Sequence, residues 1–127
     1  MHKVVSFTAK DFGAYEDHAL VVGFARDKRD EESEDALVLQ RATEAEEDTG
    51  IYAEIPPQRF VSYGGVKEAE LARDSFSVTF EPEARAELDG ISAMRISFAM
   101  SEEDFSRIMK MLSRIFRDHA AFKIQTG

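Results

Sequence analysis

The side chains that most often do chemistry in proteins are few in this chain, and they are scattered along it. The three histidines, His2, His18 and His119, show neither the His-x-His nor the His-x-x-x-His spacing of a transition-metal site. Cysteine is absent, which excludes a thiol nucleophile and every cysteine-based zinc site. No serine lies in the Gly-x-Ser-x-Gly pattern that marks a hydrolase nucleophile.

Two clusters of ionisable residues remain as candidates for chemistry. Glu16, Asp17 and His18 form an acid–base cluster, but neighbours in sequence point apart in most backbones, so an exposed loop is the simpler interpretation. The acidic residues of 27–48 offer oxygen ligands for calcium, yet they lack the alternating Asp-x-Asp-x-Asp-Gly register that folds around the ion. We therefore expect no enzyme activity, no cofactor and no metal site. A calcium- or small-molecule-binding module using these acidic loops stays open as an alternative.

Acidic residues are concentrated in one window of the chain. Residues 27–48 hold ten acidic residues against three basic ones, a net charge of −7 out of −9 for the whole chain. Such a density repels nucleic acid and anionic lipid, and it attracts a basic protein partner. The alternative is a pair of solvated loops that keep the protein soluble. The residues of this window that we predict to bind a partner are Asp30, Glu31, Glu32, Glu34, Asp35, Glu44, Glu46, Glu47 and Asp48.

Length and composition predict one domain over residues 1–127. The chain has 127 residues, of which 43% are hydrophobic, enough for a single core without disulfides. No apolar run approaches the ~18 residues that span a bilayer, and the N-terminus shows no signal-peptide pattern. The absence of cysteine fits a reducing compartment, so we expect a cytoplasmic protein.

Hydrophobic periodicity predicts mostly strands, followed by one long helix. The segment 3–9 is a possible edge strand, and 19–26 is apolar on both faces, as in a covered central strand. The acidic run 27–35 then links 19–26 to the next strand as the long loop of a hairpin, and 42–50 is a second acidic loop. The predicted strands are 3–9, 19–26, 36–39, 51–55, 60–63, 67–72, 76–80 and 94–98.

The C-terminal helix, 101–118, is the clearest element. Ser101 can cap its first turn, and apolar residues recur at the 3.6-residue period from Phe105 to Phe116. We expect this stripe to pack on one face of a twisted, mostly antiparallel sheet, which gives an α+β fold. Shorter signals are a helical turn over 81–88, a turn at Asp89-Gly90, and a tail over 119–127 that frays or adds a strand at 121–124.

The middle of the chain combines two short strands with distinctive turn residues. Pro56 and Pro57 separate 51–55 from 60–63, and Gly64-Gly65 follows as the tight turn of a predicted hairpin. Tyr52, Gln58 and Tyr63 lie in this region and form a second group of predicted partner-binding residues. Tyrosines anchor interfaces at low entropic cost, but these could equally pack across strands as structural residues.

The order of these features resembles the immunity protein 10 family of bacterial polymorphic-toxin systems. The resemblance spans about residues 18–117 and rests on the ordered set of the 20–24 strand, Leu39-Gln40-Arg41, the acidic connector, 51–55, Gln58, Tyr63-Gly64-Gly65-Val66, the 76–80 strand and the final amphipathic helix. It implies a non-catalytic protein that binds and neutralises a cognate toxin. The charge asymmetry adds the hypothesis that the acidic residues cover a basic active-site cleft of that toxin. We expect a monomer or homodimer that binds neither nucleic acid nor membrane. A homo-oligomeric scaffold is a second alternative, beside the calcium- or small-molecule-binding module.

Overall fold

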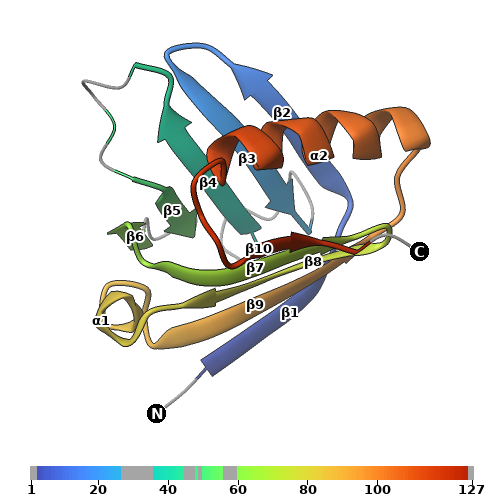
Figure 1. Cartoon of the computed structure of the whole chain (residues 1–127). Coiled ribbons are helices and arrows are strands. Elements are labelled where there is room, and N and C mark those ends of the chain that lie inside the picture. The colour runs from blue at the N-terminus through green and yellow to red at the C-terminus, as the bar shows by residue number, and fades with distance from the viewer. Residues whose placement is uncertain (1–2, 27–35, 45–47, 49, 56–59, 126–127) are drawn as a thin grey trace.

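The computed structural model describes residues 3–26, 36–44, 48, 50–55 and 60–125, with the backbone only for 60–63. Within these residues the chain forms ten strands and two helices (Figure 1). In chain order they are β1 (Lys3–Ala9), β2 (Asp11–Glu16), β3 (Ala19–Ala25), β4 (Ala36–Ala42), β5 (Tyr52–Ile55), β6 (Phe60–Tyr63), β7 (Val66–Ala72), β8 (Ser75–Phe80), α1 (Pro82–Arg85), β9 (Ile91–Phe98), α2 (Glu102–Ile115) and β10 (Phe122–Ile124).

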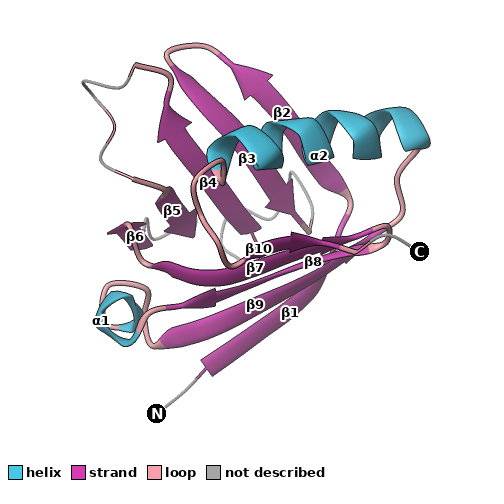
Figure 2. Ribbon diagram, viewed as in Figure 1, coloured by secondary structure: helices cyan, strands magenta, loops and turns pink. Residues whose placement is uncertain are grey.

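The described strands belong to two sheets. One, with the order β1-β9-β8-β7-β10, is called here the mixed sheet, because β1 runs parallel to β9 and β10 parallel to β7. The other, with the order β2-β3-β4-β5-β6, is antiparallel throughout and is called the antiparallel sheet. The sheets lie at a steep angle to each other, and α2 crosses the antiparallel sheet above the mixed sheet (Figure 2).

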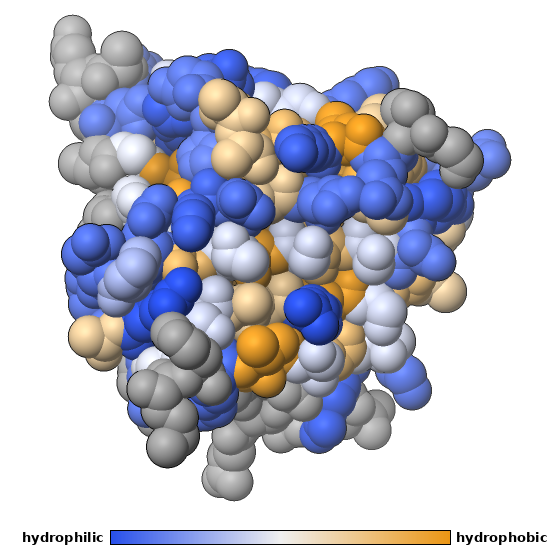
Figure 3. Space-filling view, turned by 60° about the horizontal axis from the view of Figure 1, so that its bottom comes forward, coloured by the Kyte–Doolittle hydropathy of each residue, from blue (hydrophilic) through white to orange (hydrophobic). Residues whose placement is uncertain are grey.

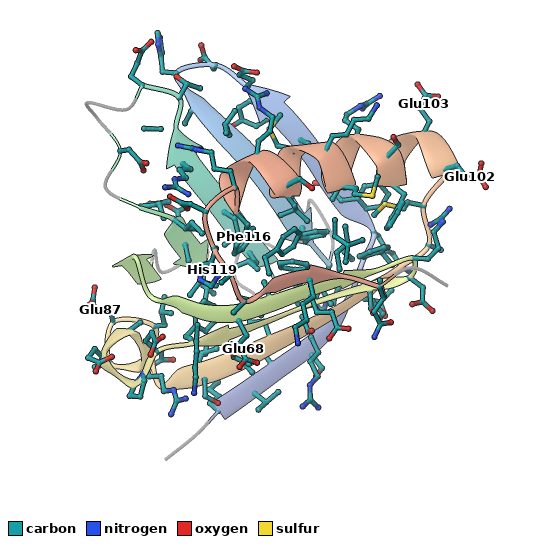
Figure 4. All side chains as sticks on the ribbon, in the orientation of Figure 1. Glu68, Glu87, Glu102, Glu103, Phe116 and His119 are labelled. Carbon is teal, nitrogen blue, oxygen red and sulfur yellow. The ribbon has the colours of Figure 1, made fainter. Side chains whose placement is uncertain are left out.

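Helix α2 forms within the predicted 101–118, and it ends at Ile115, earlier than predicted. The Ser101 hydroxyl accepts a hydrogen bond from the Asp104 backbone N–H at 3.1 Å, and Glu102 and Glu103 lie at the positive N-terminal end of the helix dipole (Figure 4). Its buried stripe, which includes Ile108 and Leu112, joins the hydrophobic core. The expectation that this stripe is core is therefore confirmed.

A single hydrophobic core connects both sheets and the helix. Phe24 of β3 stacks on Phe76 of β8 at 5.4 Å between ring centroids and on Phe98 of β9 at 5.9 Å. Alternation in β8 buries Phe76 while Ser77, on the other face, stays half-exposed, as the period-2 pattern predicts. The α+β class with a C-terminal amphipathic helix is confirmed, whereas the sheet is split in two rather than continuous.

The Gly64-Gly65 turn does not close a hairpin, so that prediction is wrong. β6 belongs to the antiparallel sheet and β7 to the mixed sheet, and the two strands do not pair. Gly64 adopts φ +69° and donates its N–H to the Ile51 carbonyl at 2.9 Å, while the Gly65 carbonyl accepts from the Glu81 N–H at 2.7 Å. A glycine at positive φ turns the chain sharply whether it joins paired strands or, as here, two different sheets.

The remaining predicted elements vary in accuracy. β1 is an edge strand and β3 a covered central strand, as expected. β4 is longer than the predicted 36–39, and β2 was not predicted at all. Part of the tail forms β10, and Phe122 stacks on Phe116 at 4.6 Å, which holds the chain against β7. His119 supports this return by bonding the Val66 carbonyl at 3.0 Å (Figure 4).

Candidate functional site

Most of the acidic residues predicted to bind a partner lie outside the described residues. These are Asp30, Glu31, Glu32, Glu34, Asp35, Glu46 and Glu47, together with Gln58. Of the predicted set, Glu44 is exposed, Asp48 and Tyr52 are half-buried, and Tyr63 is placed by its backbone in β6. Glu44, Asp48 and Tyr52 border the acidic segments, and the candidate site is built from these residues and their contacts.

The two acidic segments attach to opposite ends of β4. Segment 27–35 lies between β3 and β4, whose register pairs Ala25 with Ala36, and segment 43–51 follows the other end, where Ala19 pairs with Ala42. A seven-residue strand is roughly 20 Å long at ~3.3 Å per residue. The acidic charge is therefore anchored at two separate ends of one inner strand.

Arg41 fixes the second acidic segment at Asp48. The Arg41 side chain is 7% exposed, and its Nη2 lies 2.9 Å from Asp48 Oδ2, with Nε donating to the same carboxylate. On the other side Nη1 donates to Asp118 Oδ1 at 2.6 Å and to the Ile115 carbonyl at 3.0 Å. A buried guanidinium is costly unless its donors are satisfied, and here two carboxylates and a carbonyl satisfy them.

Both described borders of this segment are held within the fold. Asp48 also accepts from the Gly50 N–H at 3.0 Å and from Arg117 Nη2 at 3.3 Å. At the other border, the Thr43 hydroxyl donates to the His18 carbonyl at 3.1 Å. The Asp48 carboxylate therefore makes internal contacts, while Glu44 next to Thr43 faces solvent.

The Arg41 cluster lowers the pKa of both of its carboxyl groups. The hydrogen bonds from Arg41 are the main cause for Asp48, with the Gly50 N–H adding to them, and they are also the main cause for Asp118. A carboxyl group whose pKa is lower in the folded protein than in the unfolded chain stabilises the fold above its unfolded pKa. That contribution is lost as the pH falls through the lowered folded pKa.

We expect the unfolding free energy to fall below about pH 4, where both aspartates take up protons in the unfolded chain while Arg41 still holds them ionised in the folded protein. The Arg41→Met variant lacks the guanidinium that lowers both pKa values, so its stability should change less over the same pH range. Urea unfolding of the two proteins at about pH 7 and about pH 3 measures the difference. If the unfolding free energies of the wild type and of Arg41→Met changed equally between the two pH values, the assigned role of Arg41 would be contradicted.

The predicted tyrosines lie opposite each other in the antiparallel sheet. The register of β5 and β6 pairs Tyr52 with Tyr63, and β4 pairs Gln40 with Tyr52. The Tyr52 hydroxyl donates to Glu54 Oε1 at 2.5 Å. The same row continues through Val21 to Tyr15. Sequence reasoning missed Tyr15 because β2 was not recognised, although Gly13 and Tyr15 alternate with Phe12 and Ala14.

In the acid–base cluster at 16–18, Glu16 contacts α2, whereas Asp17 and His18 lie together at the surface. Glu16 Oε1 bonds Arg114 Nη1 of α2 at 2.6 Å, which is the main reason that its pKa is lowered. Asp17 and His18 lie 3.8 Å apart with 75% and 99% of their side chains exposed. Across the described part of the chain, no group of three or more His, Cys, Asp or Glu side chains could hold a metal ion.

The outer side of the mixed sheet is a second open surface. A shallow hollow there is lined by hydroxyl side chains around Arg95, including Ser6, Thr8, Ser77 and Ser97. Figure 3 shows this side as weakly polar side chains with charged ones scattered among them. None of the predicted partner-binding residues lies in this hollow. Among the helices that the structure describes, none is long and apolar enough to cross a membrane.

Comparison with known proteins identifies a matching family. The family model described as immunity protein 10 matches residues 8–106, well over half of the chain. This range includes β2 to β9, both acidic segments and the first turn of α2. No curated protein and no solved structure matches the chain.

Proposed function

Because this chain belongs to the immunity protein 10 family, we propose that it binds a cognate bacterial toxin directly and covers the surface with which the toxin acts. Membership of an immunity family implies toxin neutralisation, and it supports a role in binding rather than catalysis. The observation that carries the proposal is the extent of the match, which includes the whole antiparallel sheet and both acidic segments.

The charge distribution supports a basic partner surface. The window 27–48 carries −7 of the chain's net −9, and its two acidic segments adjoin the two ends of β4. A toxin that grips phosphate needs a basic cleft, and an acidic protein is drawn to such a cleft and oriented by it. We place the contacts on the acidic segments, with Tyr52, Gln58 and Tyr63 as a second group.

The proposal also places the protein in the cytoplasm of the cell that makes the toxin. A protein without cysteine suits that reducing compartment. Neutralisation by occlusion requires one exposed binding surface per toxin, which a monomer provides and a homodimer provides twice.

A titration of toxin activity tests binding without turnover. We expect the gene for the cognate toxin to lie beside the gene for this protein. That toxin is purified, and its activity is measured at a fixed concentration while the protein is added. Occlusion predicts that toxin activity falls linearly and reaches its minimum at a fixed molar ratio of this protein to the toxin. Light scattering should then show a complex with the same ratio. Continued inactivation by a small molar fraction of the protein would indicate catalysis and contradict the proposal.

A further inference from the structure

We propose that the toxin docks on the outer face of the antiparallel sheet, the face turned away from α2, with Tyr15 as an anchor. This outer face is defined by Asp11, Tyr15, Val21, Gln40, Tyr52 and Glu54, of which Tyr15 is exposed, Val21 is buried at 6% exposure and the other four are half-buried. The inference rests on the proposed function and specifies where it is carried out. It adds β2, a strand that contains none of the predicted partner-binding residues.

The first observation is the register of the sheet. Successive pairings bring Tyr15, Val21, Gln40, Tyr52 and Tyr63 into one row across all five strands of the antiparallel sheet. The chain has three tyrosines, and all three occupy this row. Residues paired across strands in an antiparallel sheet share a face, so Tyr15, Gln40 and Tyr52 belong to one surface.

The second observation is exposure. Tyr15 is 61% exposed, and in the described part of the chain only Val4 is a comparably exposed large hydrophobic residue, at 50%. Tyrosine is enriched at protein interfaces, where its ring buries area at low entropic cost and its hydroxyl stays hydrated or bonded. A tyrosine exposed to this extent can bury its ring against a partner.

The third observation is access. The opposite face of this sheet is filled by the core, where Leu20, Val22 and Phe24 of β3 pack with the buried stripe of α2. Neither described helix lies on the outer face (Figure 2). Beside the tyrosine row runs a row that begins with Gly13 and Gly23, and a Cβ placed on Gly13 would meet nothing within 4 Å. A partner side chain can therefore approach the backbone closely here.

The fourth observation is charge, which identifies the partner surface as basic. Among the described strand residues of the outer face, the charged ones are Asp11 and Glu54, both acidic. The acidic segments 27–35 and 43–51 adjoin its two ends. On the opposite side of the sheet, α2 and the residues after it expose Arg107, Lys110, Arg114 and Arg117. A basic toxin surface is attracted to the outer face, whereas the same face of a second copy of this chain would present like charge to it.

Two variants with matched controls on the mixed sheet test the inference. Tyr15→Ala removes the anchor, and Gln40→Lys adds a positive charge to the middle of the row. Val4→Ala truncates the other exposed hydrophobic residue, and Ser77→Lys adds the same charge to a half-exposed position on the inner strand β8. The probe is the purified toxin domain encoded beside this gene, with binding measured by calorimetry. Thermal unfolding of each variant shows whether it is folded.

Tyr15→Ala and Gln40→Lys are each expected to weaken binding about tenfold or more, and the two controls less than about twofold. The inference would be overturned if the outer-face variants bound the toxin with wild-type affinity, or if the controls lost as much affinity as they do. Either result would leave the proposed function intact. Failure of the wild-type protein to bind the toxin would overturn both. A wild-type dimer that Gln40→Lys dissociates in light scattering would assign the face to self-association and overturn the inference.

Discussion

Reversing Glu31, Glu32, Glu46 and Glu47 to lysine is expected to slow association with a basic toxin by about 100-fold at low salt. The four changes alter the net charge of the chain from −9 by eight units and place new positive charge in both acidic segments. Electrostatic steering raises association rates when the two surfaces are complementary, and like charge removes that gain. Stopped-flow association at several salt concentrations measures the effect.

A charge-matched control separates local complementarity from net charge. Reversal of Glu68, Asp74, Glu83 and Glu87, all exposed and away from the antiparallel sheet, changes the net charge equally. The control should retain most of the wild-type rate, and the difference between variants should shrink as salt shortens the screening length to ~3 Å near 1 M. Both variants should unfold within about 1 kcal/mol of wild type. Equal rates for wild type and the first variant would refute the acidic-surface account, while toxin neutralisation would stand.

The Phe24→Ala variant is expected to lose about 4 kcal/mol of unfolding free energy, the largest stability effect predicted here. Phe24 is 2% exposed and stacks on Phe76 and Phe98, so it joins the antiparallel sheet to the mixed sheet. Removing the ring leaves a cavity where two rigid sheets meet, and such a site collapses poorly. Urea denaturation measures the loss.

The exposed Tyr15→Ala variant provides the comparison, with an expected change within about 0.5 kcal/mol. A double-mutant cycle between Phe24→Leu and Phe76→Leu should show a coupling of about 0.5 to 1.5 kcal/mol, because stacked rings interact beyond the area they bury. A loss below about 1 kcal/mol for Phe24→Ala would contradict the packing of β3 on β8.

Local patterns in the sequence predicted the individual elements well. Helix α2 was predictable because its cap, its first-turn acids and its apolar period agree with one another. β8 was predictable because strict alternation fixes which side chains face the core. β2 was missed because Gly13 interrupts its short apolar pattern, and an edge strand needs no strong pattern once β3 offers a free edge.

Long-range pairing was not predictable from local patterns. Gly64-Gly65 signals a turn, but only the completed fold shows that the turn joins two sheets. The parallel pairings of β1 with β9 and of β10 with β7 join segments far apart in the sequence, and no local signal encodes them. The split into two sheets follows from these pairings.

The composition of the candidate site was predictable, but its geometry was not. The acidic window is evident from counting charges, whereas its attachment to opposite ends of β4 depends on register. In the sequence Arg41 is one of three bases within the acidic window, and its contact with Asp118 depends on how α2 ends against β4. The tyrosine row likewise appears only when five strands are aligned.

Co-expression with the toxin encoded beside this gene tests the central claim most directly. Cells that make the toxin alone should die, and cells that also make this protein should survive and yield a stable complex of the two on purification. Survival together with that complex is the predicted result. Death of the co-expressing cells, with the folded protein present and no complex recovered, would contradict neutralisation by direct binding.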